Sequence, residues 1–127
     1  MNLYNLRKVD FIHNDDRGSL IQLIHSGFSQ VNLLISNKNS NRGAHFHKKT
    51  KEAFYVIDGS VLTTFWNDKF KQTVVFKKGD FFEIPVNILH NMYFQEDCSM
   101  IQLYEQPVID LNGNKDIFLE EDYYAHN

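Results

Sequence analysis

The chain contains 127 residues, of which 43% are hydrophobic and 23% are charged, a size and composition typical of one globular domain. Its 11 Phe, 6 Tyr and 1 Trp exclude a disordered chain, because large apolar side chains offset the entropy lost on folding. The net charge of −3 excludes the basic surface with which proteins bind nucleic acids or anionic membranes. We therefore expect neither a nucleic acid nor a membrane as a partner.

Residues 1–9 contain no apolar signal segment, and no later run reaches the length of a membrane span. The lone cysteine, Cys98, excludes an intramolecular disulfide and a cysteine-rich zinc site. Together these features predict a cytoplasmic protein.

Short runs rich in β-branched and aromatic residues dominate the chain and predict strands. In chain order they are 20–24, 31–35, 53–57, 61–66, 70–76, 81–84 and 100–104. Turn residues separate them, and Asp58-Gly59 between two apolar runs is the strongest hairpin signal. The tail 115–124 is predicted as a short helix or an extra strand. Many short strands with frequent turns are typical of a sandwich or barrel, so we predict a single all-β domain over residues 1–127.

Three of the six histidines fall into a spaced pattern with one glutamate. His45 and His47 alternate, so both imidazoles project from the same face of a strand. Glu52 follows in the first segment and His90 in a second one. The full order is Gly43-x-His45-x-His47-x4-Glu52-x6-Gly59, then Gly79-x5-Pro85-x4-His90.

Both segments resemble the two signature motifs of the cupin superfamily, whose fold is a double-sheet jelly-roll barrel. In that family the motif side chains converge on one metal ion, which implies His45, His47, Glu52 and His90 as ligands here. Three imidazoles and a carboxylate suit a divalent ion such as zinc, nickel, manganese or iron. The sequence departs from the second motif at Asn87, where Gly is usual, and at Phe94, where Asn is frequent.

The segments 15–20 and 42–49 are similar to the nucleotide-sugar branch of the cupins. That branch includes the dTDP-sugar 3,4-ketoisomerases, the 3,5-epimerases and the C-terminal cupin of capsule-sugar reductases. The resemblance implies an isomerase or epimerase that acts next to the carbonyl of a nucleotide-diphospho-4-keto-sugar. It also implies proton transfer by three histidines, namely His45, His47 and His90.

Two positions depart from the ketoisomerase pattern. Val31 and Asn32 stand where ketoisomerases tend to have tyrosines, and Glu52 stands where they tend to have Gln. The retained glutamate looks more like the metal-binding capsule-reductase cupins. A histidine bound to metal cannot use the same lone pair as a base. The base would then be another residue, and the sequence leaves open Tyr55, Tyr93, Glu83 and Lys48.

Cations and aromatic rings near the motif are candidate substrate contacts. Arg17, Arg42 and Lys48 could bind a diphosphate, because guanidinium and ammonium groups match its charge. Tyr55 could stack on the sugar ring.

Other interpretations and a dimer also follow from the sequence. The same ligands would serve a metal-dependent cupin oxygenase or lyase with another small substrate, and the third alternative is a non-catalytic sugar-binding cupin. Residues 3–12 mix apolar and polar positions as an exchanged edge strand would. Cupins of this type often pair through N-terminal strands, so we expect a homodimer.

Overall fold

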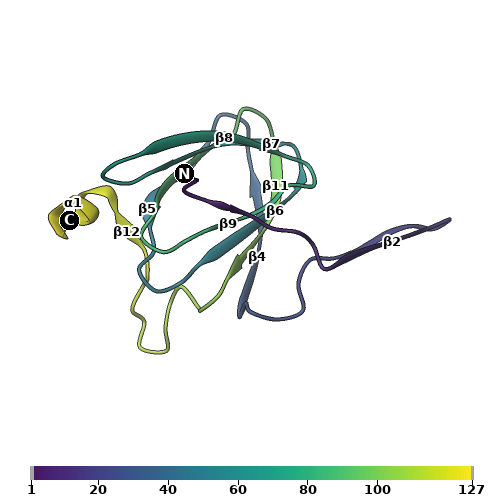
Figure 1. The fold of residues 1–127 in the computed structure, drawn as a ribbon, viewed down its shortest axis with the longest axis horizontal. Helices are drawn as coiled ribbons and strands as arrows, with labels where there is room; N and C mark the ends of the chain where they lie inside the picture. Colours follow the sequence, from purple (N-terminus) through teal and green to yellow (C-terminus); the bar gives the residue numbers. More distant parts are fainter. Residues whose placement is uncertain (1, 127) are drawn as a thin grey trace.

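The computed structural model describes residues 2–126, which form a barrel of antiparallel strands with one terminal helix (Figure 1). The elements are β1 (Asn5–Leu6), β2 (Phe11–Asp15), β3 (Gly18–Gln22), β4 (Gln30–Ser36), β5 (Asn41–Phe46), β6 (Glu52–Asp58), β7 (Ser60–Trp66), β8 (Lys71–Lys77), β9 (Phe81–Ile84), β10 (Leu89–Tyr93), β11 (Cys98–Tyr104), β12 (Phe118–Leu119) and α1 (Glu120–His126). No helix in the described part of the chain has the length and apolar character needed to cross a membrane.

Two five-stranded sheets make the barrel, in the orders β1-β9-β6-β11-β4 and β12-β5-β10-β7-β8. Each strand places alternate side chains between the sheets. In β7, for example, Val61, Thr63 and Phe65 are buried while the residues between them are partly exposed. Aromatic side chains such as Phe54, Phe82 and Phe94 fill the interior. The all-β jelly-roll barrel predicted from the sequence is confirmed.

The prediction of a hairpin at Asp58-Gly59 is wrong, although strands flank it on both sides. β6 pairs with β9 and β11, whereas β7 pairs with β8 and β10, so the turn passes from one sheet to the other. Gly59 has a φ of 82°, and a Cβ there would lie 2.2 Å from the carbonyl oxygen of Asp97. The glycine therefore serves a tightly packed corner between sheets.

The tail forms both of the elements that the sequence left open, a strand and then a helix. Phe118 and Leu119 pair with Phe46 and His45 of β5, and α1 follows at once. The C-terminal segment therefore lies beside the strand that carries the first histidines.

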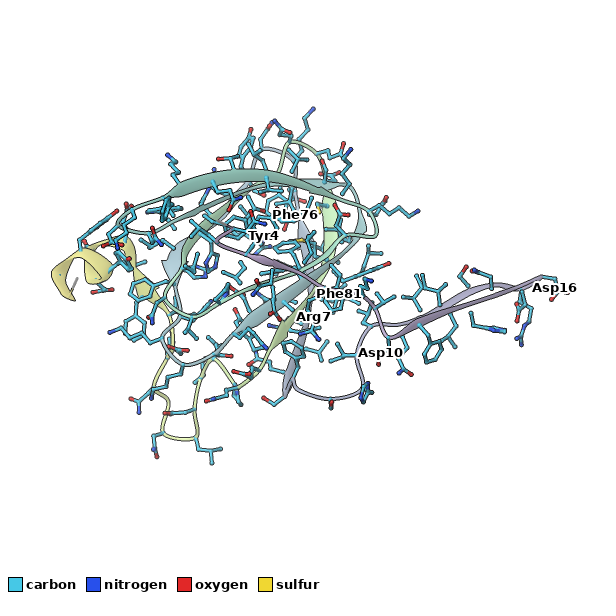
Figure 2. All side chains as sticks on the ribbon, in the orientation of Figure 1. Tyr4, Arg7, Asp10, Asp16, Phe76 and Phe81 are labelled. Atoms are coloured by element: carbon cyan, nitrogen blue, oxygen red, sulfur yellow. The ribbon has the colours of Figure 1, made fainter. Side chains whose placement is uncertain are left out.

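Strands β2 and β3 form a separate hairpin that projects from the barrel, with Asp16 at its far end (Figure 2). Its apolar side chains, including Phe11, Ile12 and Leu20, are exposed. β1 pairs with β9 of the same chain. Residues 3–12, which the sequence predicted as a strand exchanged between subunits, therefore lie partly in the barrel and partly in the hairpin of the same chain.

Candidate functional site

The four motif side chains come from three strands and meet between the two sheets. His45 lies on β5 opposite His90 on the neighbouring β10, and His47 follows the end of β5. Glu52 begins β6 in the other sheet. One ligand atom from each of the four side chains lies within 4.8 Å of the others. The structure thus brings together the four side chains that the cupin resemblance groups at one site.

An irregularity in β5 directs His45 inward. Gly43 and Ala44 have φ angles of 116° and 58°, and the register between β5 and β10 shifts beside them. A Cβ on Gly43 would lie 2.8 Å from the carbonyl oxygen of His90. The two strands approach this closely only because position 43 has no side chain.

Asn87 explains how the second motif tolerates the loss of its usual glycine. Its φ is 63°, a left-handed conformation that Asn adopts more readily than most residues. Its backbone N–H donates to the carbonyl oxygen of His47 at 2.7 Å. The turn before β10 thereby holds the first histidine segment against the second.

Glu52 lies at the centre of the cluster with an exposed fraction of 0%. Its Oε1 atom is 3.0 Å from Nε2 of His47 and 2.8 Å from Nε2 of His90. The Nδ1 atoms of the two rings face carbonyl oxygens, that of Asp116 at 2.5 Å and that of Ile88 at 3.0 Å. Because a carbonyl only accepts, each Nδ1 carries the proton, and in the neutral rings both Nε2 lone pairs face the carboxylate.

When both rings are neutral, this arrangement lacks positive charge. Nε2 of His90 makes no hydrogen bond among the described residues despite its 2.8 Å approach to Glu52, because the geometry is unsuitable. Two lone pairs and a buried carboxylate repel one another unless protons or a cation lie between them. Atoms bound to one divalent ion at about 2.1 Å lie about 3 Å apart when the bond angle is near 90°. The donor set and spacing fit such an ion.

The ionisation of the residues follows from the same geometry. Burial, reinforced by the nearby His90, lowers the pKa of His45 to about 4. Burial opposes the charged form of His47, but the Glu52 carboxylate raises the pKa of that ring above its usual value. Burial alone would raise the pKa of Glu52, and the two imidazoles His90 and His47 lower it instead. His45 is therefore neutral near pH 7 and Glu52 is ionised.

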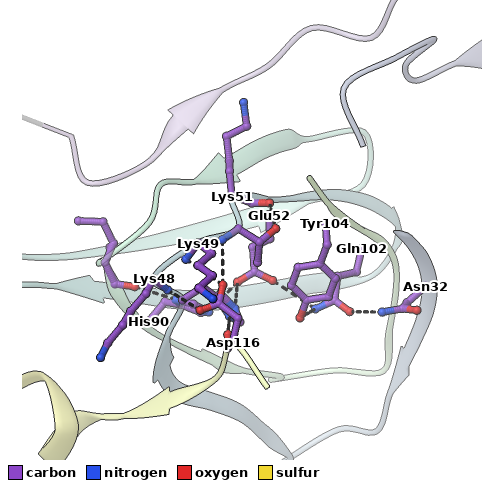
Figure 3. Close-up of polar contacts among 12 residues, drawn as sticks. Asn32, Lys48, Lys49, Lys51, Glu52, His90, Gln102, Tyr104 and Asp116 are labelled. Atoms are coloured by element: carbon purple, nitrogen blue, oxygen red, sulfur yellow. Dashed lines mark hydrogen bonds and ion pairs between the residues drawn. The ribbon is translucent and has the colours of Figure 1, made fainter. Parts of the chain in front are cut away.

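A layer of polar residues that sequence reasoning missed holds the other oxygen of Glu52 (Figure 3). Nε2 of Gln102 donates to Oε2 of Glu52 at 3.3 Å and to the hydroxyl of Tyr104 at 3.1 Å. Nδ2 of Asn32 donates to Oε1 of Gln102 at 2.9 Å. Gln102 and Tyr104 were available as signals, because they are polar groups at alternate positions of an apolar strand.

A cavity of about 410 Å³ opens onto His45, Glu52 and His90. Its size lies within the usual range for small-molecule sites. Its walls combine apolar side chains with polar ones, namely Leu34, Phe54, Met92, Asn41, Arg42 and Gln102. A larger open groove of about 640 Å³ lies beside Trp66, but none of the four motif residues lines it.

Of the predicted diphosphate ligands, the structure brings only Arg42 to the cavity. Its Nε donates to Ser36 Oγ at 2.9 Å, which fixes the guanidinium at the cavity wall. Arg17 lies beside Asp16 in the hairpin turn and pairs with Asp15 at 2.6 Å. Lys48 places its Nζ 4.1 Å from the centre of the Phe118 ring.

Tyr55 and the other proposed bases also lie away from the cavity. Tyr55 follows Phe54 on β6 and therefore points to the opposite face, where it packs against Phe81. Tyr93 donates to Asn39, and Glu83 pairs with Arg7 at 2.9 Å. None of these three residues lines the cavity, whose ionisable lining groups are Arg42, His45, Glu52 and His90.

Comparisons with known proteins agree with this fold. The family model for the polysaccharide biosynthesis C-terminal domain matches residues 13–112. No curated protein matches the sequence.

Solved structures with similar folds include three proteins of sugar metabolism. The TDP-quinovose 3,4-ketoisomerase WlaRB from Campylobacter jejuni superposes with a TM-score of 0.81 at 19% identity, over 100% of both chains. The sugar 3,4-ketoisomerase QdtA from Thermoanaerobacterium thermosaccharolyticum, in complex with TDP, gives 0.80 at 20% identity, over 98% of this chain and 93% of that one. The capsular polysaccharide assembling protein CapF from Staphylococcus aureus gives 0.62 at 24% identity, over 86% of this chain but only 32% of its own.

Proposed function

The chain belongs to the polysaccharide biosynthesis C-terminal domain family, and from this membership we propose that it is a nucleotide-sugar isomerase or epimerase. Its substrate would be a nucleotide-diphospho-4-keto-sugar, on which it acts at the carbon next to the carbonyl. The observation that carries the proposal is the 410 Å³ cavity, which is lined by His45, His90 and Arg42. The cupin barrel that the chain shares with two 3,4-ketoisomerases supports it.

The reaction needs a base, and His45 is the residue of the cavity best suited to it. A proton next to a ketone is removed by a group that is unprotonated at working pH and within reach of the substrate. The ring of His45 lines the cavity, and its lowered pKa of about 4 keeps it neutral at pH 7. In isomerisation a proton returns to the former carbonyl carbon, while the neighbouring hydroxyl passes its proton to the former carbonyl oxygen. In epimerisation a proton returns to the original carbon from the opposite face.

A divalent ion bound by His47, Glu52 and His90 is the second part of the proposal. The Nε2 atoms of both histidines already lie within 3.0 Å of the Oε1 atom of Glu52. Such an ion would supply a Lewis acid that stabilises negative charge on the substrate oxygen. His45 also lies within the four-residue cluster. If His45 transfers the proton and the other three residues bind the metal, then no histidine has to use the same lone pair both as a ligand and as a base.

We also propose a homodimer, with the edge strand β4 as part of its interface. Val31, Leu33 and Ile35 project from the same face of this strand and are 66%, 64% and 66% exposed. A row of aliphatic side chains on a sheet edge is normally covered by another chain. The exposed apolar side chains of the β2–β3 hairpin extend the uncovered area, so a second copy is the partner that we infer.

The proposed activity is tested by solvent isotope exchange. In deuterium oxide, the wild-type protein should introduce deuterium into the sugar ring of a dTDP- or UDP-linked 4-keto-6-deoxyhexose, as read by mass spectrometry. The Tyr55→Phe variant is a matched control, since its hydroxyl lies outside the cavity, and it should exchange at the wild-type rate. Absence of both exchange and binding in the two nucleotide series would overturn the nucleotide-sugar assignment and leave a metal cupin with another substrate.

A further inference from the structure

A buried aspartate in the C-terminal segment binds the loop that joins the two halves of the first motif. Asp116 is 8% exposed, and its carboxylate accepts three backbone N–H bonds (Figure 3). Lys48 donates to Oδ1 at 2.8 Å, while Lys49 and Thr50 donate to Oδ2 at 2.9 and 2.8 Å. Among the described residues this carboxylate has no ion-pair partner. Its negative charge is therefore met by the amides of the His47–Glu52 connection.

The backbone of the same residue contacts the histidine ring. The carbonyl oxygen of Asp116 accepts from Nδ1 of His47 at 2.5 Å, which leaves Nε2 directed at Glu52. The side chain of Asp116 thus binds the loop after His47, and its backbone carbonyl orients the ring of His47. Movement of either contact would move the other, because both belong to one residue.

We propose that Asp116 is a positioning residue, which holds His47 in the tautomer with the proton on Nδ1 and the Nε2 lone pair facing the site. The inference rests on the metal-binding part of the proposed function, since a ligand nitrogen must be free of its proton. Outer groups that accept the second imidazole proton typically change metal affinity by about 10- to 100-fold when they are lost. Through Asp116 the C-terminal segment would thereby contribute to metal binding at the site.

Asp110 provides a matched control within the same segment. Its carboxylate also accepts backbone N–H bonds, from Asn112 and Asn114 at 2.9 Å each, but it lies in an exposed turn. The Asp116→Asn and Asp110→Asn variants make the same chemical change. In each of them an amide NH₂ replaces an accepting oxygen. At position 116 at least one backbone donor then loses its partner, because both oxygens of Asp116 accept backbone N–H bonds. At position 110 both backbone donors share Oδ1, so the group that loses its acceptor is the side-chain amide of Asn114. Only the substitution at position 116 should change the tautomer of His47.

The first experiment reads the tautomer by long-range ¹H–¹⁵N NMR of the histidine rings. The metal-free protein is held with EDTA at a pH where the rings are neutral, and His47 is assigned from the His47→Gln spectrum. The wild type and Asp110→Asn should show His47 protonated on Nδ1, and Asp116→Asn should show a mixture of tautomers. A wild-type His47 protonated on Nε2 would overturn the proposal without any variant having to fold.

The second experiment measures zinc affinity by calorimetry, with circular dichroism to verify folding. A folded Asp116→Asn protein should bind zinc about 10- to 100-fold more weakly than the wild type, and Asp110→Asn should bind it equally well. Unchanged tautomer and unchanged affinity in folded Asp116→Asn would refute the positioning role. Neither measurement uses a sugar nucleotide, so failure of the proposed reaction and failure of this inference are distinguishable.

Discussion

The motif site and the N-terminal hairpin are incomplete in opposite ways. At the site, an ionised Glu52 is fully buried between imidazoles whose lone pairs face it. In the hairpin and on the adjacent edge strand β4, apolar side chains such as Phe11 and Leu33 are exposed. The first region has buried charge that requires a cation, and the second has apolar surface that requires a cover.

The difference indicates what each region binds. Buried charge without compensation is costly, so a fold retains it where an ion or a reacting group completes it. Contiguous exposed apolar rows are unfavourable in water to a lesser degree and often mark surfaces that another protein covers. In the function that we propose, small-molecule chemistry takes place inside the barrel and chains associate outside it, so substitutions can test the two proposals independently.

The largest effect is expected from the histidines, and it separates the two roles within the site. His45→Asn should lower the rate of deuterium exchange by about 10²- to 10⁴-fold while the protein still binds zinc, because His45 acts as the base. His90→Gln should abolish both exchange and zinc binding. His13→Gln, in the hairpin, should alter neither. Loss of zinc from His45→Asn would show instead that His45 is a ligand.

The next prediction concerns the sign of the effect of Glu52→Gln on stability. Zinc at a hundredfold excess over its dissociation constant should stabilise the wild type by about 2.7 kcal/mol, which raises Tm by roughly 10 °C. The variant should not respond to zinc. Without metal it should unfold at a lower temperature than the wild type near pH 7, because the lowered pKa of Glu52 and the raised pKa of His47 mean that the fold favours the ionised carboxylate beside the imidazoles, an attraction that a neutral amide lacks. A variant that is more stable than the wild type without metal would contradict this account, and calorimetry measures both states.

These site predictions start from residues that the sequence identified, because the chemistry and spacing of the motif were both visible. His45, His47, Glu52 and His90 are recognisable as a set since the order and separation of four unusual side chains repeat a known pattern. The strands were predictable for a similar reason, since apolar and β-branched runs form strands wherever they pair.

The rest depended on pairing between distant segments, which local patterns do not contain. Asp58-Gly59 has the composition of a hairpin, yet its flanking strands enter different sheets. Asp116 lies 69 residues from the ring that its carbonyl contacts, and no short motif marks it. Tyr55 was predicted to contact the substrate, but side chains alternate between the two faces of a strand. Phe54, and not Tyr55, shares the inward face of β6 with Glu52.

Association through β4 should show a smaller effect that leaves the site intact. Leu33→Glu places a charge in the middle of the exposed aliphatic row and should weaken the dimer by about tenfold or more, as a cost of about 1.4 kcal/mol implies. Val75→Glu on β8, the edge strand of the other sheet, is the matched control and should leave the mass unchanged. Sedimentation over a range of concentrations measures both. A wild type that is monomeric at all concentrations would contradict the proposed dimer. Equal effects of the two variants would contradict the assignment of β4 to its interface.

The smallest expected effect compares two arginines, one in each region. Arg42 lines the cavity, so Arg42→Gln should raise the KM for a nucleotide sugar by about tenfold and change kcat little, because phosphate contacts add binding to substrate and transition state alike. Arg17 lies at the hairpin turn and pairs with Asp15, so Arg17→Gln should change KM by less than about twofold if a single chain forms the whole site. Steady-state kinetics with both variants decides the matter. An equal rise in KM for Arg17→Gln would mean that the hairpin reaches a substrate site, and the long projection of Asp16 from its own barrel would then require that site to belong to a second copy. Repeating the measurement in the Leu33→Glu background tests this point, since a contribution made across the dimer should disappear with the dimer, whereas the effect of Arg42→Gln should persist.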